Sequence, residues 1–509
     1  MTDPVLRPGA TCWRIARADR MAVIVDAAAY FSHLKAAILQ AQHSVLMIGW
    51  DFDTRVQLDR DGGDPAAPDQ LGRFLSHVVR RNRQVQIHVL RWDLAFLKMP
   101  IRGMPPLILL DWLASPRLHF RLDRHHPAEA CHHQKIVVID DALAFCGGID
   151  ITIDRWDTPA HRDDDPQRLR PGGAPYGPWH DVTTAVDGAA ARALGDLARA
   201  RWQAATGRSL PAPPPDQVRW PGGLEPAFRD VDVAIARTEP AYDGQDEVHE
   251  IEALYLAAIA SAKRCIYLES QYFSSHRIAA ALGARLAEPD GPEVVIVNPH
   301  RSIGWLEEEV MGSARALLLG RLRAADRYGR LRFCTPVTEG GADIYVHAKV
   351  LVVDDALLRV GSSNINNRSM GLDTECDLAV EVDPDAANAA ALRAAILEVR
   401  DALVSEHLGV DRETLRQTLD AEGGSLARTL DRLIRPAGRS LRPFTPPALT
   451  ETEQALAETH ALDPGRPESM AETFIHTMHI FTPRHFAANA AGALARLFTG
   501  SKPLPGTGG

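Results

Sequence analysis

The pattern His-x-Lys-x4-Asp occurs twice in this chain of 509 residues and constrains its fold more than any other feature. The first copy begins at His133 and the second at His347. Aligned without a gap, residues 133–151 and 347–365 are identical at nine of 19 positions. Such a repeat indicates that the chain arose by duplication. We therefore expect two similar halves that contribute to one composite site.

Short apolar runs alternate along the chain with segments of helix length. Runs of this kind, rich in Val and Ile, are typical of strands buried on both faces. They lie at 85–90, 135–139, 293–298 and 349–353. The Ala/Leu/Arg segments between them lie at 187–206, 276–287 and 310–327. This alternation predicts an α/β fold with a mostly central sheet and flanking helices.

A proline-rich segment, LPAPPPD at 210–216, divides the halves. From residue 411 the pattern changes to helical stretches without strand-like runs, and an apolar helical face over 486–497 favours packing on the body over a membrane-surface helix. The predicted organisation is an N-terminal domain over 1–209, a linker over 210–227, a C-terminal domain over 228–410 and a mostly helical extension over 411–509.

Composition argues against several classes of protein. The chain has 66 acidic and 56 basic residues and a net charge of -10, which disfavours a dedicated nucleic-acid binder, although a local basic cleft stays open. Its six cysteines are scattered, so we expect free buried thiols. We see no secretory signal, and no apolar run reaches the roughly 18 residues of a membrane span. We predict a cytoplasmic protein without a transmembrane segment; peripheral membrane contact stays open.

Each copy of the repeat places a histidine two residues before a lysine. On a strand these side chains project from the same face, so His133 is paired with Lys135 and His347 with Lys349. The lysines can neutralise phosphate oxygens while one imidazole attacks phosphorus and the other protonates the departing oxygen. This chemistry requires no metal and no other cofactor.

Three further positions belong to the repeat. Asp140 and Asp354 follow the apolar runs, which favours orienting a ring or bracing a turn over direct attack. Seventeen residues after each histidine stand Asp150 and Asn364. Asn364 offers amide donors to a phosphate oxygen. An ionised Asp150 would repel phosphate, so we expect it to support the site rather than bind substrate.

The chain resembles the phospholipase D superfamily, specifically its phospholipase branch, over most of residues 13–409. Besides the two repeats, the resemblance rests on GWDFDTR (49–55), the Gly-Gly-x-Asp step (147–150), PWHDV (178–182), ESQYF (269–273), GSSNINNRSMGLDTE (361–375) and EHLG (406–409). It implies a pseudo-twofold pair of α/β/α domains, each with a mixed central sheet, and one active site at their interface.

The resemblance also implies roles for the site residues. His133 would form a phosphohistidine, and His347 would protonate the leaving alcohol and later activate water. The order of the two histidines comes from the resemblance alone. The residues expected to hold the phosphate oxygens are Lys135, Lys349 and Asn364. The candidates for orienting the histidines are Glu375, Asp140 and Asp354.

The function predicted is hydrolysis of a glycerophospholipid, such as phosphatidylcholine or phosphatidylethanolamine, at a membrane surface. The products are phosphatidic acid and the head-group alcohol, and another alcohol can replace water to give transphosphatidylation. A cardiolipin-synthase-like phosphatidyltransferase is the first alternative. A nuclease of the same superfamily is a weaker one.

Other features allow more than one interpretation. The His-rich stretch at 125–133 matches no common zinc spacing, so we predict no metal there. The polar loop at 157–178 is either an active-site loop or a solvated excursion. The acids of 304–310 fit a solvated helix start. Several aromatic residues could line a lipid channel or belong to the core: Trp50, Trp92, Trp179, Tyr272, Phe273 and Trp305.

Overall fold

The computed structural model describes residues 4–60, 62, 67–93, 103–214, 219–302, 311–447 and 463–465. The features predicted for 304–310 and 486–497 lie outside these residues, as does Trp305.

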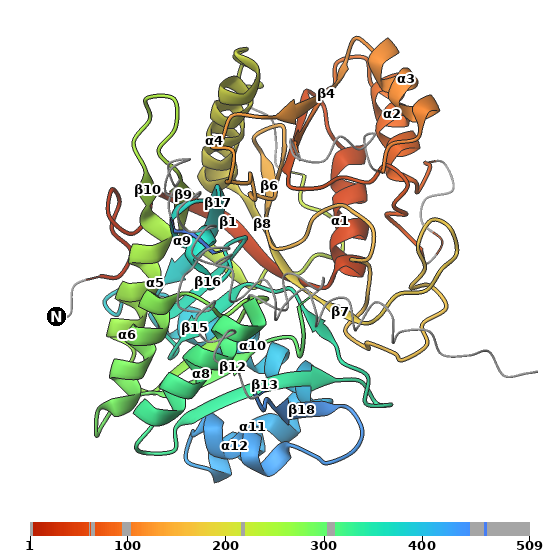
Figure 1. The fold of residues 1–509 in the computed structure, drawn as a ribbon. Coiled ribbons are helices and arrows are strands. Elements are labelled where there is room, and N and C mark those ends of the chain that lie inside the picture. Colours follow the sequence, from red (N-terminus) through yellow and green to blue (C-terminus); the bar gives the residue numbers. More distant parts are fainter. Residues whose placement is uncertain are drawn as a thin grey trace, which may run out of the picture.

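One continuous mixed sheet runs through both halves of the molecule (Figure 1). The N-terminal half supplies β1 (Arg14–Val25), β2 (Ser44–Gly49), β3 (Gln86–Trp92), β4 (Leu118–Asp123), β5 (Ile136–Ile139), β6 (Leu143–Gly147) and β8 (Val182–Asp187). The C-terminal half supplies β9 (Phe228–Glu239), β10 (Val248–His249), β11 (Cys265–Glu269), β12 (Glu293–Val297), β13 (Leu331–Val337), β15 (Val350–Val353), β16 (Leu357–Gly361), β17 (Glu375–Glu381) and β18 (Ser440–Pro443).

The strand order shows the duplication directly. The N-terminal half has the order β4-β3-β2-β5-β6-β8-β1, and the C-terminal half repeats it as β13-β12-β11-β15-β16-β17-β9. β1 and β9 are antiparallel neighbours, paired from Arg14 with Ile235 to Met21 with Phe228, and they join the two series edge to edge. The expected α/β fold with two pseudo-symmetric halves is confirmed. The fusion of their sheets into one was not predicted.

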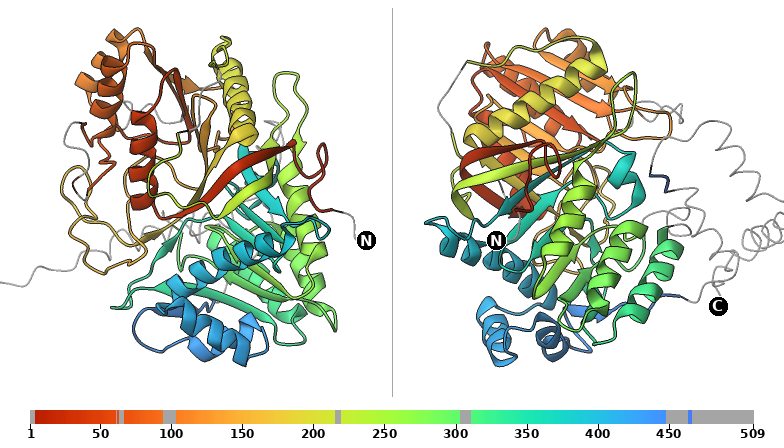
Figure 2. Two further views of the ribbon diagram at one scale, coloured as in Figure 1. Left: turned by 180° about the vertical axis from the view of Figure 1, so that it is seen from behind. Right: turned by 90° about the vertical axis from the view of Figure 1, so that its left-hand side faces the viewer.

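Helices cover both faces of this sheet (Figure 2). They are α1 (Ala27–Leu39), α2 (Leu71–Arg81), α3 (Pro106–Ala114), α4 (Gly188–Thr206), α5 (Glu250–Ser261), α6 (His276–Ala287), α8 (Ser313–Ala325), α9 (Asn367–Gly371), α10 (Ala389–Leu408), α11 (Arg412–Ala421) and α12 (Leu426–Leu433). None of these described helices is long and apolar enough to cross a membrane.

Alternation along β2 shows why the apolar runs became strands buried on both faces. Val45 and Met47 pack in the core beneath α1 and α2, whereas Leu46 and Ile48 face the core that contains α4. That second core continues across the β1–β9 joint to α10. A third core lies under α5, α6 and α8 on the other face of the C-terminal half. Because every central strand is covered twice, its sequence is apolar without alternation.

The segment after residue 411 departs from the prediction of helices alone. α11 and α12 are helical, but β18 pairs antiparallel with β13 and becomes an edge strand of the main sheet. Asp463 also lies against the body, where its carboxylate accepts hydrogen bonds from the backbone amides of Asn367 and Arg368 at the start of α9. The described part of the extension is therefore integrated with the C-terminal half. The domain boundaries themselves stay a prediction.

All six cysteines are free and buried, as expected. The Sγ atoms of Cys146 and Cys376 lie 3.7 Å apart, on strands of different halves.

Asp140 and Asp354 brace turns and do not contact the histidines. The Asp140 carboxylate accepts hydrogen bonds from the amides of residues 42–44, at 2.6–2.8 Å. Asp354 binds the amides of residues 263–265 in the same way, at 2.8–2.9 Å. Both residues have a φ of 53°, which Asp tolerates better than most residues. Of the two roles expected for them, bracing a turn agrees with these contacts and orienting a histidine does not: they fix the start of β2 and of β11.

Replacing Asp140 by Ala should lower the free energy of unfolding by roughly 2–4 kcal/mol, because three backbone amides lose a charged acceptor. Denaturant unfolding measures this change. Asp196→Ala is the control, since that carboxylate is half exposed in a surface ion pair and should cost less than about 1 kcal/mol. An Asp140 variant that kept full stability would contradict the bracing role.

Candidate active site

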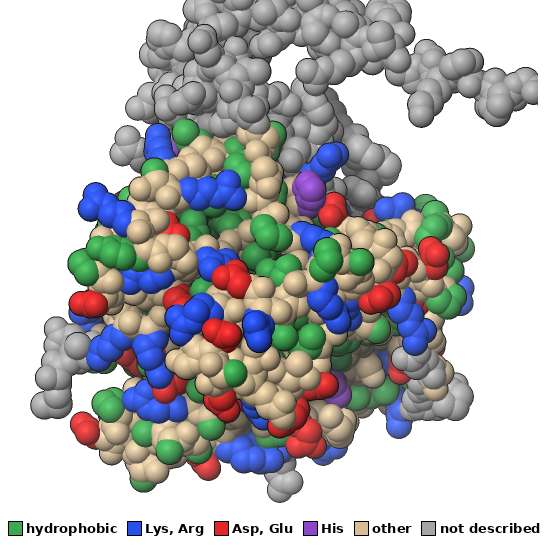
Figure 3. Space-filling view, turned by 90° about the horizontal axis from the view of Figure 1, so that it is seen from below, with side chains coloured by type: hydrophobic (Ala, Val, Ile, Leu, Met, Phe, Trp, Pro, Cys, Tyr) green, Lys and Arg blue, Asp and Glu red, His purple; other side chains and the backbone are tan. Residues whose placement is uncertain are grey.

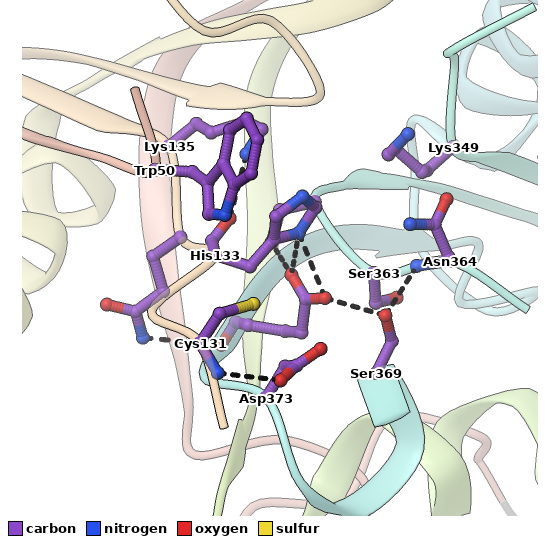
Figure 4. A network of polar contacts seen from close by, with 12 residues as sticks. Trp50, Cys131, His133, Lys135, Lys349, Ser363, Asn364, Ser369 and Asp373 are labelled. Atoms are coloured by element: carbon purple, nitrogen blue, oxygen red, sulfur yellow. Dashed lines mark hydrogen bonds and ion pairs between the residues drawn. The ribbon is translucent and has the colours of Figure 1, made fainter. Parts of the chain in front are cut away.

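His133 is held by a carboxylate from the other half of the chain. Its Nδ1 lies 2.9 Å and 3.0 Å from the two carboxylate oxygens of Glu375, at the start of β17. Hydroxyls of Ser362 and Ser369 donate to that carboxylate at 2.5 Å and 2.7 Å. The backbone amide of His133 donates a hydrogen bond to the Thr374 carbonyl, and this bond fixes the segment before β5. These contacts leave Nε2 of His133 as the ring atom available to a substrate (Figure 4).

His347 has the equivalent arrangement in the second copy of the repeat. Its Nδ1 lies 2.6 Å from Oδ2 of Asp181, which immediately precedes β8 in the N-terminal half. The short strands β7 (Trp179–His180) and β14 (Tyr345–Val346) pair next to it, and the His347 amide donates to the His180 carbonyl. Asp181 was not predicted as a site residue. The PWHDV segment contained the signal, but nothing local assigned its carboxylate to a histidine 166 residues away.

Each histidine is thus oriented by the half that does not contain it. Glu375 of the C-terminal half holds His133, and Asp181 of the N-terminal half holds His347. Both carboxylates are fully buried, and the histidine side chains are 13% and 6% exposed. Neither imidazole would be correctly placed if the two halves separated.

The two lysines of the repeat differ in their partners. Lys135 Nζ lies 2.8 Å from Oδ2 of Asp150, and both side chains are almost fully buried. Lys349 Nζ donates to the His347 carbonyl and lies 3.4 Å from Oε1 of Gln271. Asp150 therefore neutralises one lysine and also accepts hydrogen bonds from the amides of residues 50 and 51, which agrees with a supporting position.

Asn364 occupies the place in the second half that Asp150 has in the first. It is 4% exposed, and its side-chain oxygen has no hydrogen-bond partner among the described residues. Figure 4 shows its amide beside Lys349, across from the His133 ring. The amide nitrogen of Asn364 is a donor, so its place beside Lys349 favours contact with a phosphate oxygen.

Burial controls the charge state of these groups. It lowers the pKa of both imidazoles well below the usual value, and the nearby lysines lower it further. Burial raises the pKa of Glu375 to about 8 and that of Asp181 to about 6. It lowers the pKa of Lys349 to about 7. In each of these groups the largest cause of the pKa shift is the cost of a buried charge.

Aromatic rings flank both histidines. Trp50 stacks on Trp92 with ring centroids 5.8 Å apart and meets the His133 ring edge-on at 6.4 Å. Trp179 stacks on Tyr345 at 4.6 Å and lies 5.2 Å from the His347 ring. These three tryptophans therefore belong to the surroundings of the site. Phe273, in contrast, is a core residue.

Arg155 is a second residue that the sequence did not identify. Its guanidinium lies 4.2 Å from the centroid of the Trp179 ring. Its positive charge contributes to lowering the pKa of His347 and of Lys349. It therefore adds to the positive potential on the His347 side of the site.

The polar loop at 157–178 is largely exposed, but a few buried residues anchor it. Asp157, His161 and Arg168 are buried within it. Asp163 accepts hydrogen bonds from the Thr338 hydroxyl and the Gly340 amide of the C-terminal half. The loop therefore connects the two halves.

Comparisons with known proteins agree with this geometry. A family model described as "Phospholipase D" matches residues 121–213 and 337–456, which contain both histidines and both carboxylates. A second model, "Cardiolipin synthase, PLD-like domain", matches residues 255–394. The chain belongs to the phospholipase D superfamily.

Named relatives in this superfamily include phospholipases D of plants and yeast. Phospholipase D alpha 1 of Vigna unguiculata is 26% identical over 75% of this chain and 64% of its own length. Phospholipase D1 of Schizosaccharomyces pombe is 25% identical over 80% of this chain and 37% of its own length. The chain therefore spans less than two thirds of either relative.

A solved structure shares the fold. The phosphatidylserine synthase of Haemophilus influenzae matches with a TM-score of 0.50 at 12% identity, over 82% of this chain and 97% of that one. At this identity the likeness concerns the fold alone.

Replacing Glu375 by Gln should increase stability at alkaline pH relative to the native chain. Its pKa is raised from about 4.3 in the unfolded chain to about 8, so the native protein loses stability as pH rises between these values and no further above them. The glutamine amide cannot ionise. The free energy of unfolding of the variant, relative to that of the native protein, should therefore rise by on the order of 2–4 kcal/mol between pH 5 and 9. Denaturant unfolding at several pH values tests this. If the free energies of unfolding of the two proteins changed with pH in the same way, the prediction would be contradicted.

Proposed function

We propose that the chain is a phospholipase D-type phosphodiesterase that releases the head-group alcohol from a glycerophospholipid. The observation that carries this proposal is the pair of crossed imidazole–carboxylate contacts, His133 with Glu375 and His347 with Asp181, beside two lysines. Two imidazoles with separate partners suit a reaction that needs a nucleophile and a proton donor in the same step.

In the first step, Nε2 of His133 forms a bond to phosphorus while the bond from phosphorus to the head-group oxygen breaks. Glu375, when ionised, accepts a hydrogen bond from the protonated Nδ1 of His133, and this tautomer leaves the lone pair of Nε2 free. His347 gives its proton to the departing oxygen. The substrate phosphate brings a negative charge that favours this protonated form of His347, whose pKa is low in the free protein.

In the second step, water attacks the phosphohistidine and His347 takes up its proton. The product is phosphatidic acid, and His133 is regenerated. Lys135, Lys349 and the Asn364 amide would hold the phosphate oxygens in both steps, because charge develops there and the surroundings are buried. A primary alcohol in place of water would give transphosphatidylation.

A phosphatidyltransferase of the cardiolipin-synthase type is the second candidate. The match of residues 255–394 to the "Cardiolipin synthase, PLD-like domain" model supports it. Both candidates use the same phosphohistidine and differ only in whether water or a lipid alcohol attacks it.

A nuclease is less well supported. The net charge of -10 disfavours a polyanionic substrate. On the face drawn in Figure 3, basic and acidic side chains are interspersed rather than gathered into one basic field.

Substitution of each histidine tests whether His133 is the nucleophile and His347 the proton donor. His133→Asn and His347→Asn should each lower kcat on a natural phospholipid by roughly 10⁴-fold or more. On a phosphatidyl-p-nitrophenol substrate, whose leaving group needs no proton, His347→Asn should release about one nitrophenolate per site and retain a phosphatidyl group on His133. Mass spectrometry of the His133 peptide identifies this adduct.

His119→Asn is the control, because that half-buried imidazole stacks on His88 and should leave turnover unchanged. If His133→Asn, and not His347→Asn, released one nitrophenolate per site, the roles of the two histidines would be the reverse of those proposed. Near-native turnover by either active-site variant would overturn the composite site.

Incubation with a mixed phospholipid extract and a short primary alcohol tests the substrate class. Phosphatidic acid together with the phosphatidyl alcohol is the expected result, detected by lipid mass spectrometry. Cardiolipin formed only from phosphatidylglycerol would select the transferase. Turnover of nucleic acid without any lipid product would select the nuclease.

A further inference from the structure

A second cluster of ligating side chains lies at the junction of the two halves, and the proposed reaction does not use it. Its members are Asp26 between β1 and α1, His161 in the polar loop, His180 in β7 and Glu406 near the end of α10. One ligating atom from each lies within 4.8 Å of the others. The first three side chains are fully buried, and that of Glu406 is 9% exposed.

Four separations between these groups, two of them to different oxygens of Asp26, are close to those of a tetrahedral metal site. His161 Nε2 lies 3.1 Å from Glu406 Oε1 and 3.5 Å from Asp26 Oδ2. His180 Nδ1 lies 3.0 Å from Glu406 Oε1 and 3.3 Å from Asp26 Oδ1. Zinc binds such ligands at about 2.0–2.1 Å, which places tetrahedral ligands about 3.3–3.4 Å from one another.

Two buried atoms that point into the cluster have no hydrogen bond among the described residues. They are Nδ1 of His180 and Oδ2 of Asp26. His180 Nδ1 has oxygens at 3.0 Å and 3.3 Å, yet neither contact has hydrogen-bond geometry. Unsatisfied polar atoms at this depth are costly, and a bound cation would satisfy both.

The second nitrogen of each histidine contacts a further carboxylate. His161 Nδ1 lies 3.0 Å from Asp157, which Arg168 contacts in turn. His180 Nε2 lies 2.9 Å from Glu269. Metal-bound histidines commonly donate their other ring N–H to a carboxylate, which fixes the ring and its tautomer. Four carboxylates thus lie around the two imidazoles, and Arg168 offsets the charge of one of them.

We propose that Asp26, His161, His180 and Glu406 bind one structural Zn²⁺ ion. Two imidazole nitrogens and two carboxylate oxygens favour Zn²⁺ over Mg²⁺ or Ca²⁺, which take oxygen ligands. The four protein ligands fill a tetrahedral shell, so the site has no open position for catalysis.

The site lies directly behind the active site. Asp26 donates its backbone amide to the Asp181 carbonyl and accepts a hydrogen bond from the Asp181 amide. His180 is the residue before Asp181, and its carbonyl accepts from the His347 amide. Zinc would therefore fix the Asp181–His347 pair and connect α10 to the N-terminal half. The pseudo-equivalent position in the other half, before Glu375, is Thr374, so the duplicated fold does not require this cluster.

Metal analysis of the purified full chain tests the site without reference to activity. After growth with zinc and gel filtration, inductively coupled plasma mass spectrometry should find about one Zn²⁺ per chain. Removal with a strong chelator should lower the apparent melting temperature, and stoichiometric Zn²⁺ should restore it. Co²⁺ should restore it too, with the visible absorption of a tetrahedral complex.

Variants locate the ion. His161→Gln and Glu406→Gln should abolish stoichiometric binding, and Asp157→Asn should weaken it by roughly 10–100-fold. His119→Gln is the matched control and should bind as the native chain does. A native chain that binds no Zn²⁺ after metal removal overturns the proposal, whatever the variants do. Unchanged zinc content in folded His161→Gln does so as well. Nitrogen NMR that shows His161 and His180 as imidazolium ions in the presence of Zn²⁺ also overturns it.

Discussion

The crossed contact between each histidine and a buried carboxylate of the opposite half is the constraint on which this molecule depends. His133 and Glu375 are 242 residues apart, and His347 and Asp181 are 166 residues apart. The pairing of β1 with β9, which joins the two sheets edge to edge, brings these residues together. A fused sheet with one core that continues from α4 to α10 fixes the halves rigidly enough to hold both contacts.

Burial gives these contacts their chemical meaning. An exposed imidazole would titrate near neutral pH and present either nitrogen to solvent. Here burial lowers the pKa of both rings, and each carboxylate holds Nδ1 of its histidine and leaves Nε2 free. The same burial raises the pKa of Glu375, so the site carries a cost in stability that the rest of the core must offset.

The two halves share a fold but differ in their polar details. Lys135 is neutralised by Asp150, whereas Lys349 lies beside the Asn364 amide, and its pKa is lowered to about 7. The cluster around His180 lies behind the Asp181–His347 pair and has Thr374 at the corresponding place behind Glu375. The two histidines of the duplicated site therefore lie in different polar surroundings.

The sequence by itself determined the duplication, the α/β class, the buried strands and the two histidine–lysine pairs. These features are local: the face of a strand repeats every two residues, and a strand covered twice is apolar throughout. Only the tertiary structure decided the partners of the polar groups. The aspartate of the repeat follows the histidine at the same spacing in both copies, yet Asp140 binds three backbone amides and no histidine. The carboxylates that orient the rings come from Asp181 and Glu375. No local pattern encodes such contacts, because they join strands that meet only after the two sheets have fused.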